Sequence, residues 1–133
     1  MVIKSSTWEL RGEYDIVRAR KAVRQTAQEL RFGIVDQTKI ITAASELARN
    51  TVIHGGGGRM EIEVVAEGIR NGLRLCFLDE GPGIADLGLA MTEGWTSGTG
   101  LGLGLTGAKR LANEFAIEST FGHGTRVTIT RWK

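Results

Sequence analysis

The sequence predicts an α+β fold, a two-layer α/β sandwich in which helices cover one face of a mixed, mostly antiparallel sheet. Two segments, about 13–31 and 36–52, have apolar residues at helical spacing. Strand-type alternation runs through residues 60–64, and Asn71-Gly72 is a typical hairpin turn, so the strands beside it should pair antiparallel. The chain has 133 residues, of which 41% are hydrophobic and 24% charged, which suits a single domain over 1–133.

The first half of the chain is expected to form one strand and two helices. Residues 2–10 are rich in strand formers. Acidic residues at 13–15 favour a helix start, and Gly33 ends this helix after about Arg31. Asp36 is expected to cap the second helix. The buried stripe of that helix would consist of Ile40, Ile41, Ala44, Leu47, Ala48 and Val52.

The second half alternates between glycine-rich segments and regular elements. Gly55 to Gly58 is expected to be a flexible connector. Residues 84–99 show no periodicity, and a loop of that length suggests a function. A helix is expected over Leu105–Phe115, with Leu111 and Phe115 in the core. Two last strands, about 116–121 and 125–132, would flank a turn at Gly122-His123-Gly124.

Composition and charge exclude several classes of protein. No apolar run suits a membrane span or a leader, so we expect a cytoplasmic protein without a membrane partner. The net charge is only +2, which does not indicate nucleic-acid binding. The single cysteine, Cys76, excludes an internal disulfide and fits a reducing compartment, and it is expected to be a small core hydrophobe in a buried strand over 73–78.

Basic residues cluster in the first predicted helix, and they allow two interpretations. They could form an ordinary solvated helix face, or they could form a docking surface for an acidic protein partner. The cluster consists of Arg18, Arg20, Lys21, Arg24 and Arg31.

A carboxylate and a carboxamide are expected on one face of the second helix. Glu46 and Asn50 are four residues apart, and side chains at that spacing point into the same space. A carboxylate can accept a proton, and a carboxamide oxygen can hold a metal ion.

Two glycine-rich segments follow this pair. Asp79 ends a strand before Gly81 and Gly83, where a carboxylate can accept a hydrogen bond from an exocyclic amine and glycines let a flat base approach the backbone. Taken alone, this segment could also be an ordinary acidic turn. In the run Gly98 to Gly104, glycine occupies every second position before a predicted helix, and such backbone N–H groups can bind phosphate. This run lacks the preceding strand of a dinucleotide motif and the ending of a P-loop.

This order of motifs resembles the GHKL ATPase/kinase superfamily, whose ATP-binding domain has the Bergerat fold. Residues 46–50 are similar to its asparagine box, 79–83 and 98–104 to its two glycine boxes, and Gly124-Thr125 to its late Gly-Thr. The resemblance implies that ATP and Mg²⁺ are bound, that Asn50 coordinates the metal, that Asp79 binds the adenine amine, and that about 84–99 forms an ATP lid. The other nucleotide-binding residues implied are Gly81, Gly83, Ser97, Gly98, Thr99, Gly100, Leu101, Gly102, Leu103, Gly104 and Thr125.

Within the superfamily the chain resembles the RsbT-type switch kinases, which are related to the anti-sigma-factor kinases. Residues 14–17, 32–37 and 45–50 carry this likeness. It implies a serine/threonine kinase that phosphorylates STAS-domain partners in bacterial stress signalling and also activates a PPM-type phosphatase. In that reaction Glu46 would accept the proton of the substrate hydroxyl.

Two alternatives differ in chemistry. A histidine kinase would need a phospho-accepting histidine on a dimerisation hairpin, and the only histidines, His54 and His123, stand beside loop glycines. Autophosphorylation on histidine is therefore not expected. A non-catalytic nucleotide-binding module, which holds a sigma factor or another partner, remains open because binding and catalysis share residues.

Overall fold

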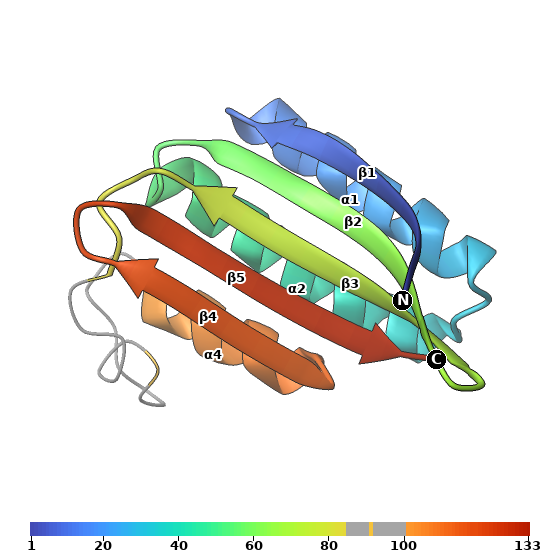
Figure 1. The fold of residues 1–133 in the computed structure, drawn as a ribbon. Coiled ribbons are helices and arrows are strands. Elements are labelled where there is room, and N and C mark those ends of the chain that lie inside the picture. The colour runs from blue at the N-terminus through green and yellow to red at the C-terminus, as the bar shows by residue number, and fades with distance from the viewer. Residues whose placement is uncertain (85–90, 92–100) are drawn as a thin grey trace.

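The computed structural model describes residues 1–84, 91 and 101–133, and the side chains of 101–103 lie outside this description. Within these residues, three helices cover one face of a five-stranded sheet of order β1-β2-β3-β5-β4 (Figure 1), in which all four neighbouring pairs are antiparallel. The predicted two-layer α+β sandwich is confirmed. The strands are β1 (Val2–Leu10), β2 (Gly58–Glu67), β3 (Arg70–Asp79), β4 (Glu114–Thr120) and β5 (Gly124–Trp132), and the helices are α1 (Glu13–Glu29), α2 (Ile34–Ile53) and α4 (Leu101–Leu111).

The hydrophobic core lies between the sheet and the helices. Leu73, Leu75 and Phe77 alternate along β3 and are at most 2% exposed, and Leu47 of α2 is 1% exposed. Burying one such side chain contributes roughly 1.5–3 kcal/mol. This packing fixes α2 against the sheet and so fixes the position of the side chains at its C-terminal end.

The hairpin between β2 and β3 turns at Gly68 and Ile69, so the predicted turn at Asn71-Gly72 was wrong. Gly68 has a φ of +62°, which suits the first position of a tight two-residue turn. The resulting register places Met60 opposite Phe77, and both side chains are buried. Burial of apolar pairs therefore outweighs the local preference of Asn-Gly for a turn.

The third described helix ends before Phe115, although the sequence suggested that it would continue to this residue. α4 stops at Leu111, and the backbone N–H of Asn113 donates to the carbonyl of Thr130, 2.9 Å away, as the chain enters β4. Leu111 and Phe115 both pack against the core as predicted, but they do so from different elements. Because the two residues are four positions apart, the sequence pattern resembled the apolar face of a single helix.

Asp36 does not cap α2, contrary to the prediction. Gly33 occupies the capping position without a side-chain hydrogen bond, and Asp36 lies in the first turn. The Asp36 carboxylate instead binds Arg131 of β5, with Oδ1 and Nη2 2.6 Å apart. Because Arg131 Nη1 also donates to the carbonyl of Leu111 at 2.9 Å, this guanidinium joins α2, α4 and β5.

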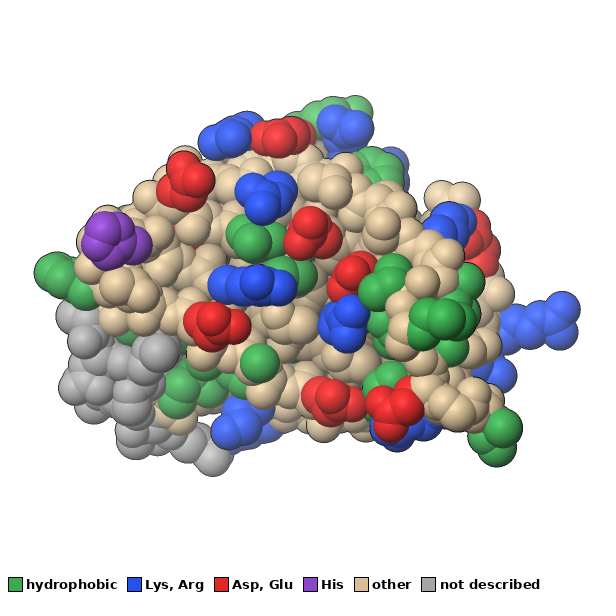
Figure 2. Space-filling view, in the orientation of Figure 1, with side chains coloured by type: hydrophobic (Ala, Val, Ile, Leu, Met, Phe, Trp, Pro, Cys, Tyr) green, Lys and Arg blue, Asp and Glu red, His purple; other side chains and the backbone are tan. Residues whose placement is uncertain are grey.

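The outer face of the sheet carries intermixed positive and negative side chains (Figure 2), including the pair Arg74–Glu63 at 2.8 Å. Cys76 lies on this side, because its neighbours Leu75 and Phe77 belong to the helix-covered core and strand residues alternate between faces. Cys76 is only 3% exposed. Its predicted burial as a small hydrophobe is confirmed, on the side of the sheet away from the helices.

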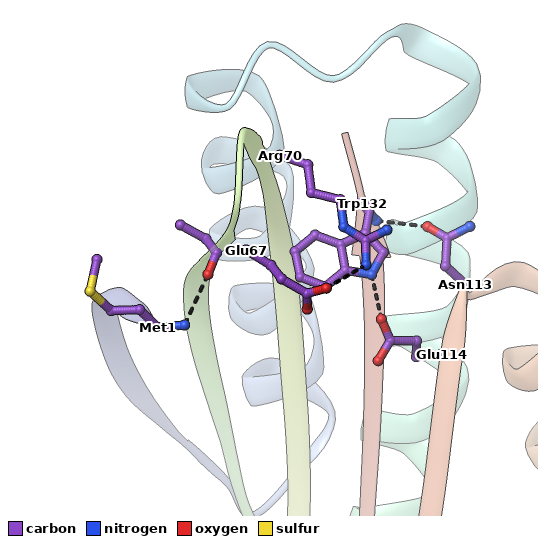
Figure 3. A network of polar contacts seen from close by, with 7 residues as sticks. Met1, Glu67, Arg70, Asn113, Glu114 and Trp132 are labelled. Carbon is purple, nitrogen blue, oxygen red and sulfur yellow. Dashed lines mark hydrogen bonds and ion pairs between the residues drawn. The ribbon is translucent and has the colours of Figure 1, made fainter.

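A polar network holds the end of the sheet where the chain terminates (Figure 3). The guanidinium of Arg70 lies over the ring of Trp132, 3.9 Å from its centroid, and binds Glu67 at 3.1 Å. The Trp132 ring N–H donates to Glu114, and the backbone N–H of Trp132 donates to Asn113 Oδ1 at 2.7 Å. These contacts join β2, β3, β4 and β5 at one end of the sheet and leave the other end available for a site.

No helix in the described ranges is long and apolar enough to cross a membrane.

Candidate functional site

A pocket lies at the opposite end of the sheet, where β3 ends, β5 begins and α2 reaches its C-terminus. Its walls are mostly apolar, and a few polar groups point into it, as is typical of a site for a small molecule. Of the predicted residues, it brings together Asn50, Asp79, Gly83 and Thr125. The described lining residues are Leu47, Asn50, Thr51, His54, Gly55, Phe77, Asp79, Gly83, Ile84, Leu105, Thr125 and Val127.

Asp79 is the acidic group of the pocket. Its Oδ1 accepts a hydrogen bond from the backbone N–H of Gly81 at 2.9 Å, and the backbone of Thr125 supplies a second one. Burial nevertheless raises the pKa of the Asp79 carboxyl above its ordinary value of 3.8, because desolvation outweighs these two hydrogen bonds. A ligand that offers further N–H donors would stabilise the ionised carboxylate.

The tetraglycine segment has a structural role beside Asp79. A Cβ on Gly55 would overlap the Asp79 side chain, and a Cβ on Gly81 would overlap the backbone of Gly55. Gly58 already belongs to β2, and a Cβ there would overlap the carbonyl of Leu78. The predicted connector is shorter than expected, because Gly58 lies in β2, and Gly55 and Gly58 permit the close approach of α2, β2 and β3 around the acid.

Asn50 lies on the same helix as the predicted acid, one turn further along. Its Nδ2 atom is buried and has no hydrogen-bond partner among the described residues. Gly104 of α4 faces this carboxamide, and a Cβ on Gly104 would lie 3.0 Å from Asn50 Nδ2. The fold thus holds the carboxamide at the pocket without using its full hydrogen-bonding capacity.

The second glycine box is partly included in α4. Because the helix begins at Leu101 rather than near Leu105, Gly102 and Gly104 lie in its first turn. The first four N–H groups of a helix have no partner within it and carry positive partial charge, which favours a bound anion. Ser97, Gly98, Thr99 and Gly100 lie outside the described residues, as does most of the predicted lid at 84–99, and nothing is described of the Leu101 and Leu103 side chains.

Glu46 is exposed on α2 and does not belong to the described pocket lining. It precedes Asn50 by one helical turn, so the two residues remain neighbours on the helix surface. The Glu46 carboxylate is therefore open to solvent. Its role in catalysis remains a prediction.

Several pocket residues were not predicted from the sequence. The apolar walls are formed by Leu47, Phe77 and Val127. These residues are buried in regular elements, so in the sequence they could not be distinguished from ordinary core residues. His54 was interpreted as a loop residue, but it follows Asn50 by four residues, and this helical spacing could have indicated that it lines the same pocket.

Comparisons with known proteins agree with this geometry. Residues 35–133 match the family described as histidine kinase-, DNA gyrase B-, and HSP90-like ATPase. The chain therefore belongs to this ATP-binding family, as its motifs predicted.

Within the family the chain is similar to a serine/threonine-protein kinase and to anti-sigma factors. It is 47% identical over 120 residues to the serine/threonine-protein kinase RsbT of Bacillus subtilis, which covers 90% of each chain. It is also 32% identical over 118 residues to the anti-sigma F factor of Clostridium novyi, covering 85% of this chain and 82% of the relative. These relationships confirm the predicted kinase class and the RsbT-type resemblance.

Solved structures share the fold. The RsbU and RsbW domains of a Mycobacterium tuberculosis protein match with a TM-score of 0.67 and 20% identity, covering 98% of this chain and 33% of that one. The SiaB–SiaC complex of Pseudomonas aeruginosa matches with a TM-score of 0.55 and 13% identity, covering 99% and 91%. At these identities the likeness concerns the fold alone.

Proposed function

We propose that this protein is an ATP-dependent serine/threonine kinase that phosphorylates a STAS-domain partner in a bacterial stress-signalling switch. The observation that carries this proposal is the convergence of Asn50, Asp79 and Thr125 on one pocket, although they come from α2, β3 and β5. The similarity to the kinase RsbT supports the choice of a protein hydroxyl as the acceptor.

The pocket suits an adenine base. Phe77, Leu105 and Val127 provide apolar contact for a flat ring, and Asp79 can accept a hydrogen bond from the exocyclic amine. Backbone N–H groups at the start of α4, including those of Gly102 and Gly104, would face the phosphates.

Asn50 would hold Mg²⁺ through its carboxamide oxygen, and its chemistry fits this ion. Mg²⁺ prefers oxygen ligands and commonly uses one or two protein groups together with water and phosphate oxygens. The buried Asn50 nitrogen, which has no partner in the described part of the chain, would donate to a water or phosphate oxygen beside the ion. Bound Mg²⁺ neutralises charge on the phosphates during transfer.

Glu46 would accept a proton during the transfer. A serine or threonine oxygen of the partner forms a bond to the γ-phosphorus, while the bond from this phosphorus to the bridging oxygen breaks and leaves its electron pair on ADP. The hydroxyl proton passes to the Glu46 carboxylate. The exposure of Glu46 supports this role, because the acceptor belongs to another protein.

The basic residues of α1 would help to dock the partner. Arg20 and Arg24 are exposed and border a surface hollow with Ile34 of α2, a hydrophobic side chain that is 75% exposed. An acidic partner surface with an apolar centre would complement it.

In a second state of the switch, release from the STAS protein would let the kinase activate a PPM-type phosphatase. We place this switch in the cytoplasm, where the single thiol would stay reduced.

A second candidate function is a nucleotide-binding module that sequesters a sigma factor without turnover. The similarity to anti-sigma F factors favours this alternative. One experiment separates the two functions: incubation of the protein with ATP, Mg²⁺ and a candidate STAS protein. Phosphate on a serine or threonine that disappears in Glu46→Ala, but not in the exposed control Glu118→Ala, supports the kinase. Tight ATP binding without transfer to any partner leaves only the binding module.

A further inference from the structure

The hydroxyl of Ser119 in β4 connects two walls of the pocket. Its Oγ accepts a hydrogen bond from the backbone N–H of Ile84 at 2.8 Å. The same Oγ donates to the carbonyl of Gly124 at 3.1 Å and lies 2.9 Å from Thr125 Oγ1. Both Ile84 and Thr125 line the pocket, whereas Ser119 is not among its lining residues.

The hydrogen-bonding capacity of Ser119 determines the orientation of the Thr125 hydroxyl. A serine hydroxyl has one proton and two lone pairs. The proton goes to the carbonyl of Gly124, and the amide of Ile84 uses one lone pair. With the Ser119 proton on the carbonyl of Gly124, Thr125 donates its own proton to the second lone pair, a direction that the 2.9 Å contact permits. The Thr125 oxygen then remains as an acceptor at the pocket it lines.

Backbone contacts around Ser119 also join the first glycine box to the β4–β5 hairpin. The carbonyl of Pro82 accepts a hydrogen bond from the backbone N–H of Gly122 at 2.6 Å. A Cβ on Gly83 would overlap the carbonyl of Thr120, so the first glycine box packs directly on the β4–β5 hairpin. Ser119 adds a side-chain link to these backbone contacts.

We infer that Ser119 is a positioning residue for base selection, which holds Thr125 as a hydrogen-bond acceptor beside the acceptor Asp79. Two acceptors complement a base that presents an amine, such as adenine, and disfavour a base that presents a carbonyl in its place. This inference rests on the proposed nucleotide site, and it assigns to Ser119 an influence on specificity without contact with the ligand.

Isothermal titration calorimetry with ATP and with inosine triphosphate, which has a carbonyl in place of the amine, tests the inference. In Ser119→Ala the Thr125 hydroxyl can turn and donate, so we expect ATP to bind about tenfold more weakly and the ATP preference over inosine triphosphate to fall about fivefold. Ser119→Thr, which keeps the hydroxyl, should restore both values. Thr26→Ala removes a hydroxyl that donates within α1, and it should change neither.

The outcomes separate this inference from the proposed function. Unchanged ATP affinity in Ser119→Ala, or an equal loss for the two nucleotides, would overturn the role in base selection while the nucleotide site itself stands. If the wild-type protein binds no ATP, the proposed function fails and the inference fails with it.

Discussion

Gly104 of α4 faces the carboxamide of Asn50 in α2 so closely that a Cβ on Gly104 would lie 3.0 Å from Nδ2 and 3.2 Å from Oδ1. This contact brings the second glycine box against the residue proposed to hold Mg²⁺. The glycine therefore has two functions, because it leaves space for the carboxamide and places a helix N-terminus beside it.

Gly104→Ala should weaken Mg²⁺-dependent ATP binding about tenfold, because the new methyl group forces the Asn50 side chain to move. Alanine also favours a helix over glycine by up to about 1 kcal/mol, so the melting temperature should not fall in parallel. Gly107→Ala in the same helix is the matched control, since a Cβ there meets nothing within 4 Å. Equal ATP affinities in the two variants, measured by calorimetry, would contradict the role of this contact.

Asp79→Asn should weaken ATP binding about tenfold or more at neutral pH, because the amide cannot replace the carboxylate as a charged acceptor for the adenine amine. The same change should not destabilise the free protein at neutral pH, since it removes the cost of burying an ionised carboxylate. Calorimetry and thermal unfolding of the same samples measure the two effects. A loss of stability as large as the loss of binding energy would count against a specific role in binding.

The stability of the wild-type protein relative to Asp79→Asn should depend on pH. The pKa of Asp79 is raised in the folded state, so folding favours the protonated acid. The stability that this group contributes is fully present below its unfolded pKa of about 3.8, and it is lost as the pH rises through the higher folded value. Denaturant titrations of both proteins, from below pH 3.8 to neutral pH, measure whether the relative stability falls as the pH rises. A relative stability that increases with pH would show that the direction is wrong.

Arg131→Met should lower the free energy of unfolding by about 2 kcal/mol, because it leaves the carbonyl of Leu111 and the carboxylate of Asp36 without their shared partner. Arg131 is largely buried, with a side chain that is 12% exposed. Arg126→Met changes an exposed arginine of the same strand and should alter stability by no more than about 0.5 kcal/mol. Urea unfolding measures both, and similar losses in the two variants would remove the special role of Arg131.

Reversing the charge of α1 with Arg20→Glu and Arg24→Glu together should weaken binding of an acidic STAS partner about tenfold or more, because like charges would then face each other. ATP affinity should not change, since neither residue lines the pocket. Surface plasmon resonance with the partner measures the effect. The exposed Arg126→Glu reverses one charge away from α1 and serves as a control, and a comparable loss there would contradict a local docking surface.

Sequence patterns predicted the layers of this fold better than its connections. The buried stripe around Leu47 and the alternation near Met60 follow directly from burial, so the helix and strand they predict are present. The turn at Asn71-Gly72 and the helix up to Phe115 were misplaced, because long-range pairing with β2 and β5 decides where these elements turn and end. A local window does not contain that information.

The residues of the site were likewise only partly predictable from the sequence. Asp79 and Asn50 could be predicted because their chemistry is recognisable at fixed spacing from glycines. The roles of Gly55 and Ser119 could not, since each depends on a contact with a segment distant in sequence. Phe77 and Val127 line the pocket with side chains that also belong to the core, and the sequence alone does not distinguish these two environments.

In the proposed reaction, Glu46 assists the transfer of the γ-phosphate from ATP to a partner hydroxyl. A single-turnover reaction with ATP, Mg²⁺ and a STAS partner, followed by mass spectrometry, tests it most directly. We expect one phosphoserine or phosphothreonine for each ADP formed, and a rate that falls at least about a hundredfold in Glu46→Gln while ATP affinity is unchanged. Transfer by Glu46→Gln at the wild-type rate would exclude Glu46 as the proton acceptor, and ATP bound without phosphate on any partner hydroxyl would exclude the kinase reaction.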